Sequence, residues 1–337
     1  MIGVMTVSPP WPADLPLAPW LSVWHAPDGW AHRRYDRARA PGSARRGRLL
    51  FQTGRADMIE KYGDAIDHFR ANGWDVTAFD WRGQGGSGRL AVGDTGHIDR
   101  LDRLNDDLAA FYTQWVAEGE GPHVVLGQSM GGFVTLSTLA AGRIAPDAVI
   151  LIAPMLALRS PVGQWAGTRF ARWQVGRGDP LRPAWRRLET PAASAARQKR
   201  LTHDLTRFAD QQDFRRRWPD LCLGSPSWHW VAEAFRATAA LRDDPALSRI
   251  AIPVLMLVAQ ADRLVDARAA GRVASRLPHG ELVCFGKGCA HEILREADPV
   301  RANAFAAIDA FLARRLQPHT RRATSASSTI SSAATLA

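Results

Sequence analysis

Ser129 stands in a Gly-x-Ser-x-Gly pattern that directly follows a short apolar run. Residues 124–126 are Val-Val-Leu, Gly127 and Gly131 flank the serine, and a helix-compatible stretch opens at Gly132. In so tight a strand–turn–helix the serine takes a strained backbone conformation, and a side chain at either flanking glycine would clash across the turn. The hydroxyl is then exposed at the carboxyl end of a sheet, so Ser129 is predicted to be a nucleophile.

Two further segments supply a candidate acid and a candidate base, in that order along the chain. Asp262 follows the apolar run of residues 254–259, and His291 follows a second strand-like run at residues 281–285. The order Ser, Asp, His differs from the orders found in chymotrypsin-like and subtilisin-like proteins. We predict that His291 is a general base, and that Asp262 orients and stabilises its imidazole.

Other assignments remain open for each of these positions. Asp266 lies one turn beyond Asp262 and is an alternative acid. Ser129 could be only a helix N-cap, and His291 only a surface loop residue. Cys289 could be proposed as a second nucleophile, although no independent base is apparent for it. None of the ten histidines has metal-site spacing with a matching carboxylate, so no metal site is expected.

Residues 83–88 match the Gly-x-Gly-x-x-Gly pattern of dinucleotide-binding turns. The pattern follows a predicted strand, but no helix opens at Gly88, where the chain runs into another turn. Without a helix N-terminus there is no cradle for a pyrophosphate. We therefore expect no nicotinamide cofactor, and predict that these glycines let the loop pass close to the active site.

Strands and helices alternate through the first half of the chain. An antiparallel edge is expected near residues 30–35, and Gly73 is expected to end the first helix. Strands are predicted at residues 47–52, 75–81, 123–126 and 148–152, with helices at residues 59–69, from 104 onward and at 132–141. This alternation predicts an α/β fold with a mostly parallel, doubly wound sheet.

The pattern changes after the strand that ends at residue 152. No convincing strand appears at residues 156–245, where helices are expected around 160–174, 193–216 and 228–241. We expect a first core part at residues 1–155, a helical lid at 156–245, a second core part at 246–316 and a disordered tail at 317–337. Six of the 13 tryptophans lie in the lid: Trp165, Trp173, Trp185, Trp218, Trp228 and Trp230. Most are expected in the core, with a few lining a groove or meeting a membrane interface.

Charge and composition limit the partners and the compartment. The net charge is +10, and of 43 basic residues three are lysines, so the other 40 are arginines. No basic helix or aromatic RNA motif appears, so nucleic acid is not expected as a partner, although weak attraction to a membrane surface remains open. No apolar run approaches the roughly 18 residues of a spanning helix. Without a secretory signal, and with three unpatterned cysteines, we expect a cytoplasmic protein, and peripheral association with the inner membrane surface stays open. The oligomeric state is unknown.

Four segments resemble the lysophospholipase and monoacylglycerol-lipase branch of the α/β-hydrolase superfamily. They are residues 53–62, residues 80–89, the Ser129 turn and the Asp262 and His291 loops, and the resemblance spans about residues 28–315. It implies an α/β-hydrolase fold with an inserted helical lid, and a serine hydrolase that cleaves carboxylic esters through an acyl-enzyme. The implied substrate is lipid-like, either a lysophospholipid or a monoacylglycerol.

An oxyanion hole is expected beside Ser129, with the backbone N–H of Met130 as one donor. The resemblance implies that the backbone N–H of Arg55 is the other. Related lipases often carry His-Gly where this chain has Thr53 and Gly54, which affects substrate preference rather than the chemistry. The Arg55 side chain could meet a phosphate or carboxylate, or could simply be solvated. An acyltransferase with the same acyl-enzyme, and a non-catalytic binding protein on a hydrolase scaffold, remain alternatives.

Overall fold

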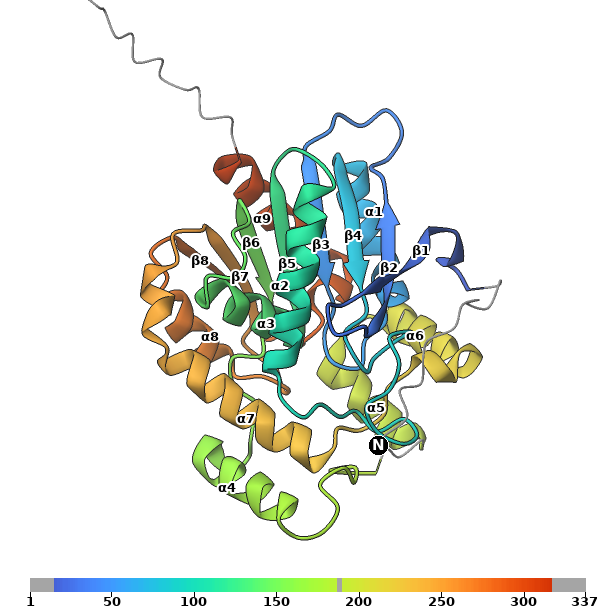
Figure 1. Ribbon diagram of the computed structural model, residues 1–337, viewed down its shortest axis with the longest axis vertical. Coiled ribbons are helices and arrows are strands. Elements are labelled where there is room, and N and C mark those ends of the chain that lie inside the picture. Colours follow the sequence, from blue (N-terminus) through green and yellow to red (C-terminus); the bar gives the residue numbers. More distant parts are fainter. Residues whose placement is uncertain (1–14, 187–189, 317–337) are drawn as a thin grey trace, which may run out of the picture.

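The computed structural model describes residues 15–186 and 190–316 of the 337-residue chain. Within those residues eight strands form one sheet, in the order β1-β2-β4-β3-β5-β6-β7-β8 (Figure 1). The strands are β1 (Leu21–His25), β2 (Ala31–Arg37), β3 (Gly47–Gln52), β4 (Trp74–Phe79), β5 (His123–Gln128), β6 (Ala148–Ile152), β7 (Val254–Ala259) and β8 (Gly280–Phe285). The β1–β2 and β2–β4 pairs are antiparallel, and every other pair is parallel. The predicted doubly wound sheet and its antiparallel edge are confirmed.

Helices cover both faces of this sheet. On one face lie α1 (Gly63–Ala71) and α9 (Asp298–Arg315), and on the other lie α2 (Asp102–Ala117), α3 (Met130–Ala140) and α8 (Ala267–Ala274). Successive residues of a strand point to opposite faces of the sheet. In β3, Leu50 packs on the α2 side, and Leu49 and Phe51 pack on the α1 side. Both faces are covered, which is why the central strands are near-continuous apolar runs.

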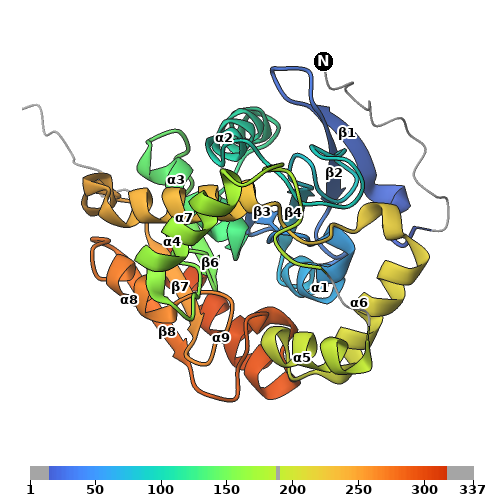
Figure 2. The same ribbon diagram turned by 90° about the horizontal axis from the view of Figure 1, so that it is seen from below.

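The inserted segment, residues 156–245, connects β6 to β7. It contains α4 (Gly163–Val175), α5 (Pro191–Leu201), α6 (Leu205–Arg217) and α7 (Trp228–Asp243). In its described residues it has no strand, only three isolated bridges: Pro183 to Ser227, Pro226 to Gly96 and Leu158 to Val265. The four helices lie beyond the carboxyl ends of the parallel strands, at the bottom of Figure 1 and in front in Figure 2. The division of the chain into core and lid stays a prediction.

Several predicted boundaries differ from the observed ones. The strand predicted to reach residue 81 ends at Phe79, and the helix after the serine begins at Met130 instead of Gly132. The helix predicted from residue 59 opens as a 3-10 turn, η2 (Ile59–Tyr62), and ends before Gly73, whose φ is +86°. Other 3-10 turns are η1 (Ala18–Trp20), η3 (Pro219–Leu221), η4 (Pro245–Arg249) and η5 (Ile293–Arg295).

The single helix predicted at residues 193–216 is wrong: it is two helices, α5 and α6. Thr202 has an extended backbone, which ends α5. Its hydroxyl donates to the Arg295 carbonyl at 2.7 Å. Asp204 then caps α6 by accepting from the Arg207 N–H at 2.8 Å. The predicted disordered tail lies outside the described residues.

Candidate active site

Ser129 occupies a strained turn between β5 and α3. Its φ of 52° and ψ of −112° lie outside the ordinary regions for a residue with a side chain. A Cβ on Gly127 would lie 2.6 Å from the Gly131 carbonyl oxygen, as expected for a clash across the turn. A Cβ on Gly131 would instead lie 2.5 Å from the Thr53 oxygen, in the loop after β3. Gly131 is therefore needed so that the neighbouring loop can approach the serine.

The backbone on both sides of Ser129 holds this turn in place. The Ser129 N–H donates to the Ile152 carbonyl at 2.9 Å, at the end of β6. Its carbonyl accepts from the N–H groups of Phe133 and Met155, at 3.1 and 2.9 Å. Because α3 and the chain at the end of β6 both bond to the backbone of this residue, the strained conformation is imposed by its surroundings.

The structure brings His291 and Asp262 to the serine hydroxyl. His291 Nε2 lies 2.9 Å from Ser129 Oγ, and Nδ1 lies 2.6 Å from Asp262 Oδ2. The other carboxylate oxygen of Asp262 accepts from the N–H groups of Leu264 and Val265, at 2.7 and 3.0 Å. A carboxylate only accepts, so Nδ1 carries the proton and Nε2 is left to accept one from the hydroxyl.

The competing residues lie elsewhere or are unsuited. The Asp266 carboxylate accepts from the Arg268 N–H and caps α8, so it does not contact the imidazole. Burial raises the pKa of the Cys289 thiol to about 12, which leaves it protonated and unreactive at neutral pH. His203 contacts the buried Glu296 at 2.9 Å, away from the serine.

The environment of His291 favours its charged form. Burial by itself lowers the pKa of the imidazole, but the charge and hydrogen bond of Asp262 outweigh it, so that the pKa is raised above its usual value of 6.5. Glu292 and Asp57 add to the same effect. An imidazole stabilised as the cation is the stronger base towards a hydroxyl in contact with it.

The loop after β3 carries the other predicted oxyanion donor, Arg55. Its neighbours are held by side chains: the Gly54 N–H donates to Asp57 at 3.1 Å, and the Ala56 N–H donates to Gln84 at 2.5 Å. A Cβ on Gly54 would lie 3.2 Å from the Ser129 Cβ, so glycine permits this close approach. The glycine-rich loop of residues 83–88 thus reaches the site through Gln84, in agreement with the expectation from its glycines.

A buried ionic network that the sequence analysis missed links this loop to the histidine loop. Lys61 Nζ lies 2.5 Å from both Asp57 Oδ1 and Glu292 Oε1, and its side chain is 2% exposed. The Tyr62 hydroxyl donates to Asp57 at 2.8 Å. Burial would raise the pKa of Asp57, but the charge and hydrogen bond of Lys61, the Tyr62 hydrogen bond and the Arg295 charge together outweigh it and lower that pKa. The one available signal was that Lys61 is one of three lysines in an arginine-rich chain.

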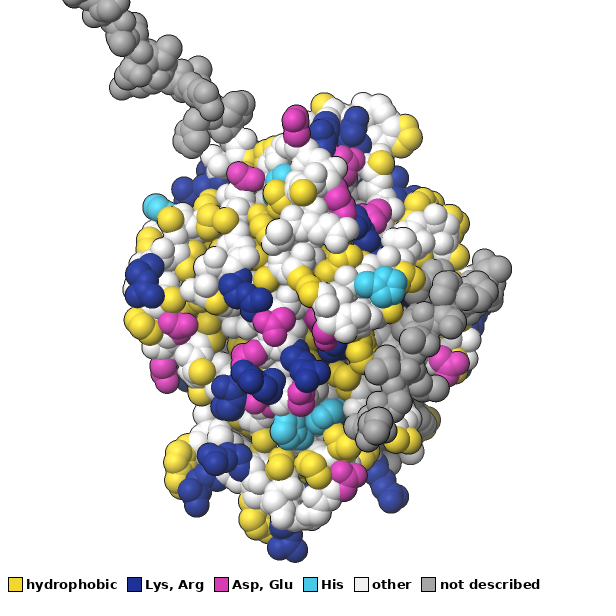
Figure 3. All heavy atoms as spheres, in the orientation of Figure 1, with side chains coloured by type: hydrophobic (Ala, Val, Ile, Leu, Met, Phe, Trp, Pro, Cys, Tyr) yellow, Lys and Arg dark blue, Asp and Glu magenta, His cyan; other side chains and the backbone are white. Residues whose placement is uncertain are grey.

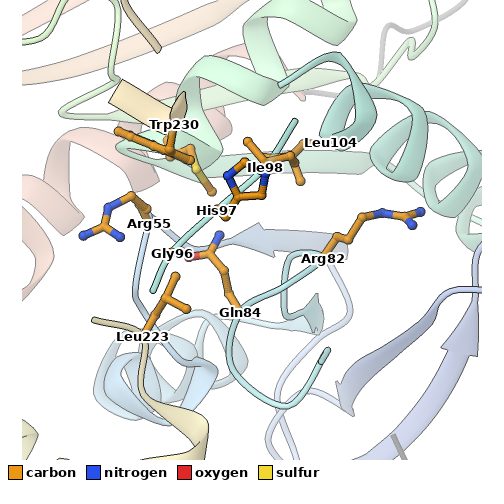
Figure 4. A pocket seen from close by; sticks show the side chains of 10 residues that line it. Arg55, Arg82, Gln84, Gly96, His97, Ile98, Leu104, Leu223 and Trp230 are labelled. Carbon is orange, nitrogen blue, oxygen red and sulfur yellow. The ribbon is translucent and has the colours of Figure 1, made fainter. Parts of the chain in front are cut away.

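A small cavity adjoins the two predicted oxyanion donors. It measures about 10 Å³, about the space for one water, and Arg55 and Met130 both line it. Figure 4 shows Arg55, Gln84, His97 and Trp230 gathered around it. The Arg55 guanidinium donates to the Gly224 carbonyl at 3.2 Å and lies 5.3 Å from the Trp230 ring. A cationic group therefore borders this cavity.

The histidine in that cavity is neutral at physiological pH. Burial, with a contribution from the nearby His229, lowers the pKa of His97 to about 4. Its Nδ1 lies 3.0 Å from the Ser227 hydroxyl. These contacts make His97 a packing residue.

The inserted segment contacts the histidine loop directly. The Glu292 N–H donates to the Leu201 carbonyl at 2.8 Å, at the end of α5. The His203 N–H donates to Glu296 at 3.0 Å, and Glu296 also accepts from the Ala290 N–H at 2.6 Å. One buried carboxylate therefore joins the inserted segment to the residue that precedes His291.

In residues 15–186 and 190–316, no group of three or more His, Cys, Asp or Glu side chains could hold a metal ion. Over the same residues, no helix has the length and apolarity needed to cross a bilayer.

Comparison with known proteins agrees with this geometry. The model of the family described as serine aminopeptidase, S33, matches residues 43–298. Lysophospholipase L2 of Escherichia coli K12 is 34% identical over 295 residues, covering 80% of this chain and 82% of that protein. A probable lysophospholipase L2 of Haemophilus influenzae is 27% identical over 289 residues, covering 81% of this chain and 85% of that protein.

Solved structures show the same fold. A soluble variant of monoglyceride lipase from Saccharomyces cerevisiae, in complex with a substrate analogue, has a TM-score of 0.71 and 20% identity, covering 88% of this chain and 96% of that one. The monoacylglycerol lipase of Paleococcus ferrophilus has a TM-score of 0.64 and 19% identity, covering 87% and 99%. The chain has the α/β-hydrolase fold and belongs to the serine aminopeptidase S33 family of hydrolases.

Proposed function

We propose that this chain is a serine hydrolase that cleaves carboxylic esters of lipid-like substrates through an acyl-enzyme. The observation that carries the proposal is that one buried imidazole, His291, contacts both the Ser129 hydroxyl and the Asp262 carboxylate. This is the arrangement that makes an alcohol nucleophilic at neutral pH.

The reaction proceeds in two halves. Ser129 Oγ attacks the ester carbonyl while His291 Nε2 takes its proton, and the N–H groups of Met130 and Arg55 stabilise the oxyanion. The imidazolium then gives the proton to the departing alcohol, which leaves the acyl group on the serine. Water attacks this acyl-enzyme with His291 again as the base, releasing the fatty acid and restoring the hydroxyl.

We propose a lysophospholipid as the preferred substrate, ahead of a monoacylglycerol. The sequence relatives are named lysophospholipases, whereas the monoacylglycerol lipases resemble this chain at 19–20% identity, which supports the fold alone. The Arg55 side chain lines the cavity beside the two proposed oxyanion donors, which supports a charged head group as its partner. An arginine pairs well with a phosphate, and a neutral glycerol head group offers it no charge.

We further propose that the protein is cytoplasmic and peripheral to the inner membrane surface. A lysophospholipid resides in or near a bilayer, and the net charge of +10 attracts the chain to anionic lipid. A strongly cationic protein reaches such substrates by binding at the surface.

The proposal is tested by labelling and turnover with the full chain. Fluorophosphonate treatment is expected to modify Ser129, located by mass spectrometry, and Ser129→Ala is expected to abolish labelling. Activity is compared on a lysophospholipid, a monoacylglycerol and p-nitrophenyl esters from acetate to laurate. Activity confined to the acetate would contradict the lipid substrate, and labelling at another residue would contradict the mechanism. Faster acyl transfer to an added alcohol than to water would identify an acyltransferase instead.

A further inference from the structure

Large apolar side chains are concentrated on one exposed part of the inserted segment. Among the described residues nine such side chains are exposed, and five of them lie between residues 162 and 185. They are Val162, Trp165, Phe170, Trp173 and Trp185, with Trp165 74% exposed. A cluster of this kind on a folded protein usually marks a surface that binds something apolar.

Helix α4 presents this cluster because its other side packs on α7. Gly167 and Ala171 are buried there, and a Cβ on Gly167 would lie 2.9 Å from the Phe235 ring. Phe170 also touches Trp228 edge-on, at 5.4 Å between ring centroids. Small residues on one side thus bring α4 close to α7 and leave the opposite side, with Trp165 and Trp173, facing outward.

Positive charge surrounds the exposed aromatics. Residues 161–186 contain five arginines and one acidic residue, Asp179. The Arg169 guanidinium lies 5.1 Å from the Trp165 ring, and that of Arg177 lies 4.6 Å from the Trp173 ring. In Figure 3 the lowest part of the molecule, where Figure 1 places α4, shows yellow apolar and dark blue basic side chains together. An arginine that extends alongside a tryptophan can hold its charge in water while the ring is buried.

We propose that the outward face of α4, formed by Trp165, Arg169, Phe170, Trp173 and Arg177, docks on the surface of an anionic phospholipid bilayer. Tryptophan suits the region between head groups and acyl chains, and arginines beside it pair with lipid phosphates. The lack of acidic residues in α4 removes repulsion from such a surface. The face therefore matches a bilayer in both polarity and charge.

The position of α4 connects docking with catalysis. The helix lies on the side of the sheet to which the carboxyl ends of the parallel strands point, the same side as Ser129 (Figure 1). A bilayer in contact with α4 would thus face the reacting edge of the molecule. Docking itself requires no turnover, so it can be judged even if the proposed activity is wrong.

The test uses the full chain with Ser129→Ala, so that the lipid stays intact. Its flotation with vesicles of phosphatidylglycerol and phosphatidylcholine is compared with flotation on phosphatidylcholine alone. We expect binding to the anionic vesicles, weakening when salt is raised to about 0.5 M. Trp165→Ala/Trp173→Ala and Arg169→Glu/Arg177→Glu are each expected to weaken binding by about tenfold or more.

A control variant replaces one exposed apolar residue and one exposed arginine, both outside α4. Leu282→Ala lies on β8, and Arg249→Glu lies in η4, at the amino end of β7 and so at the opposite end of the sheet. This variant is expected to bind as the parent does, and all variants are expected to keep the parent melting temperature. Equal binding by the α4 variants, or no binding by the parent, would overturn the proposal. A dimer that only the α4 variants lose would also overturn it, because the face would then belong to a second copy of the chain.

Discussion

Helices α5 and α6 are bound to the core by hydrogen bonds, whereas α4 of the same inserted segment packs on α7 and exposes its aromatic side chains. Around α5 and α6, Glu292 donates to the Leu201 carbonyl, and Arg295 donates to the carbonyls of Lys61 and Arg207. Helix α4 instead packs on α7 through small residues such as Gly167, and its polar bonds to Leu158 and Arg182 stay within the inserted segment. One part of the insertion is therefore bonded to the histidine loop, and another part forms an exposed apolar surface.

Removing the Ser129 hydroxyl should abolish turnover and leave both α5 and α6, and α4, in place. Ser129→Ala is expected to lower ester turnover by about 10⁶-fold, because the nucleophile acts as one unit with its base. The fold should persist, since alanine keeps the Cβ and loses only the hydroxyl, which leaves the backbone strain at this turn unchanged. Turnover is measured with a soluble p-nitrophenyl ester, and unfolding by circular dichroism. Retained turnover would remove the proposed role of Ser129.

Removing the charge that supports the base should be the next largest effect. Asp262→Asn is expected to lower kcat by about 10⁴-fold, because the amide favours the wrong imidazole tautomer. In the parent chain, activity needs neutral His291, so it should rise with pH through a midpoint above the usual 6.5. In the variant that midpoint should fall, since the main group raising the pKa is gone. An unchanged midpoint in the pH–rate profile would contradict the assignment.

Breaking the buried network should show how strongly the two catalytic loops are held together. Lys61→Met removes the cation paired with Asp57 and leaves Glu292 with Arg295 alone, which is expected to cost about 3–5 kcal/mol of unfolding free energy. Lys287→Met, at an exposed lysine, is the matched control and should cost nothing measurable. Urea unfolding measures both. Equal stability of the two variants would mean that the network contributes little.

A pair of threonines tests the two parts of the inserted segment against each other. Thr202→Val removes the hydroxyl that donates to the Arg295 carbonyl, and is expected to cost about 1–3 kcal/mol because a buried acceptor loses its partner. It should also reduce turnover, since Arg295 lies in the histidine loop. Thr168→Val in α4 removes a hydroxyl bonded within its own helix, to Gln164, and should change turnover little. If both variants lose turnover equally, α4 is coupled to the site as closely as α5.

The smallest expected effect concerns head-group choice. Arg55→Gln keeps the backbone N–H and removes the guanidinium beside the cavity. We expect kcat/KM to fall about tenfold more for a lysophospholipid than for a monoacylglycerol, because only the first carries a phosphate for a charged hydrogen bond. Arg55→Lys should retain part of the preference. An equal loss on both substrates would make Arg55 a structural residue and not a specificity residue.

The expectation for the tryptophans shows where the sequence misled. Most of those in the inserted segment were expected in the core, yet Trp165, Trp173 and Trp185 are more than half exposed, and Trp230 is buried. A tryptophan gives the same sequence pattern whether it lies in the core or on the surface. Which side of α4 faces outward depends on α7, about 60 residues further along the chain, and on how closely Gly167 lets it approach.

The amino-acid sequence by itself determined the central strands, the order of Ser129, Asp262 and His291, and the glycines around the serine. These are local signals: a run of apolar residues, a turn that tolerates no side chain, a polar residue just after a strand. The tertiary structure alone decided that Lys61 pairs with Glu292, that Thr202 divides one expected helix into two, and that α4 turns its aromatics to solvent. Such contacts join residues far apart in the chain, and no local pattern encodes the distance between two segments that meet only after folding.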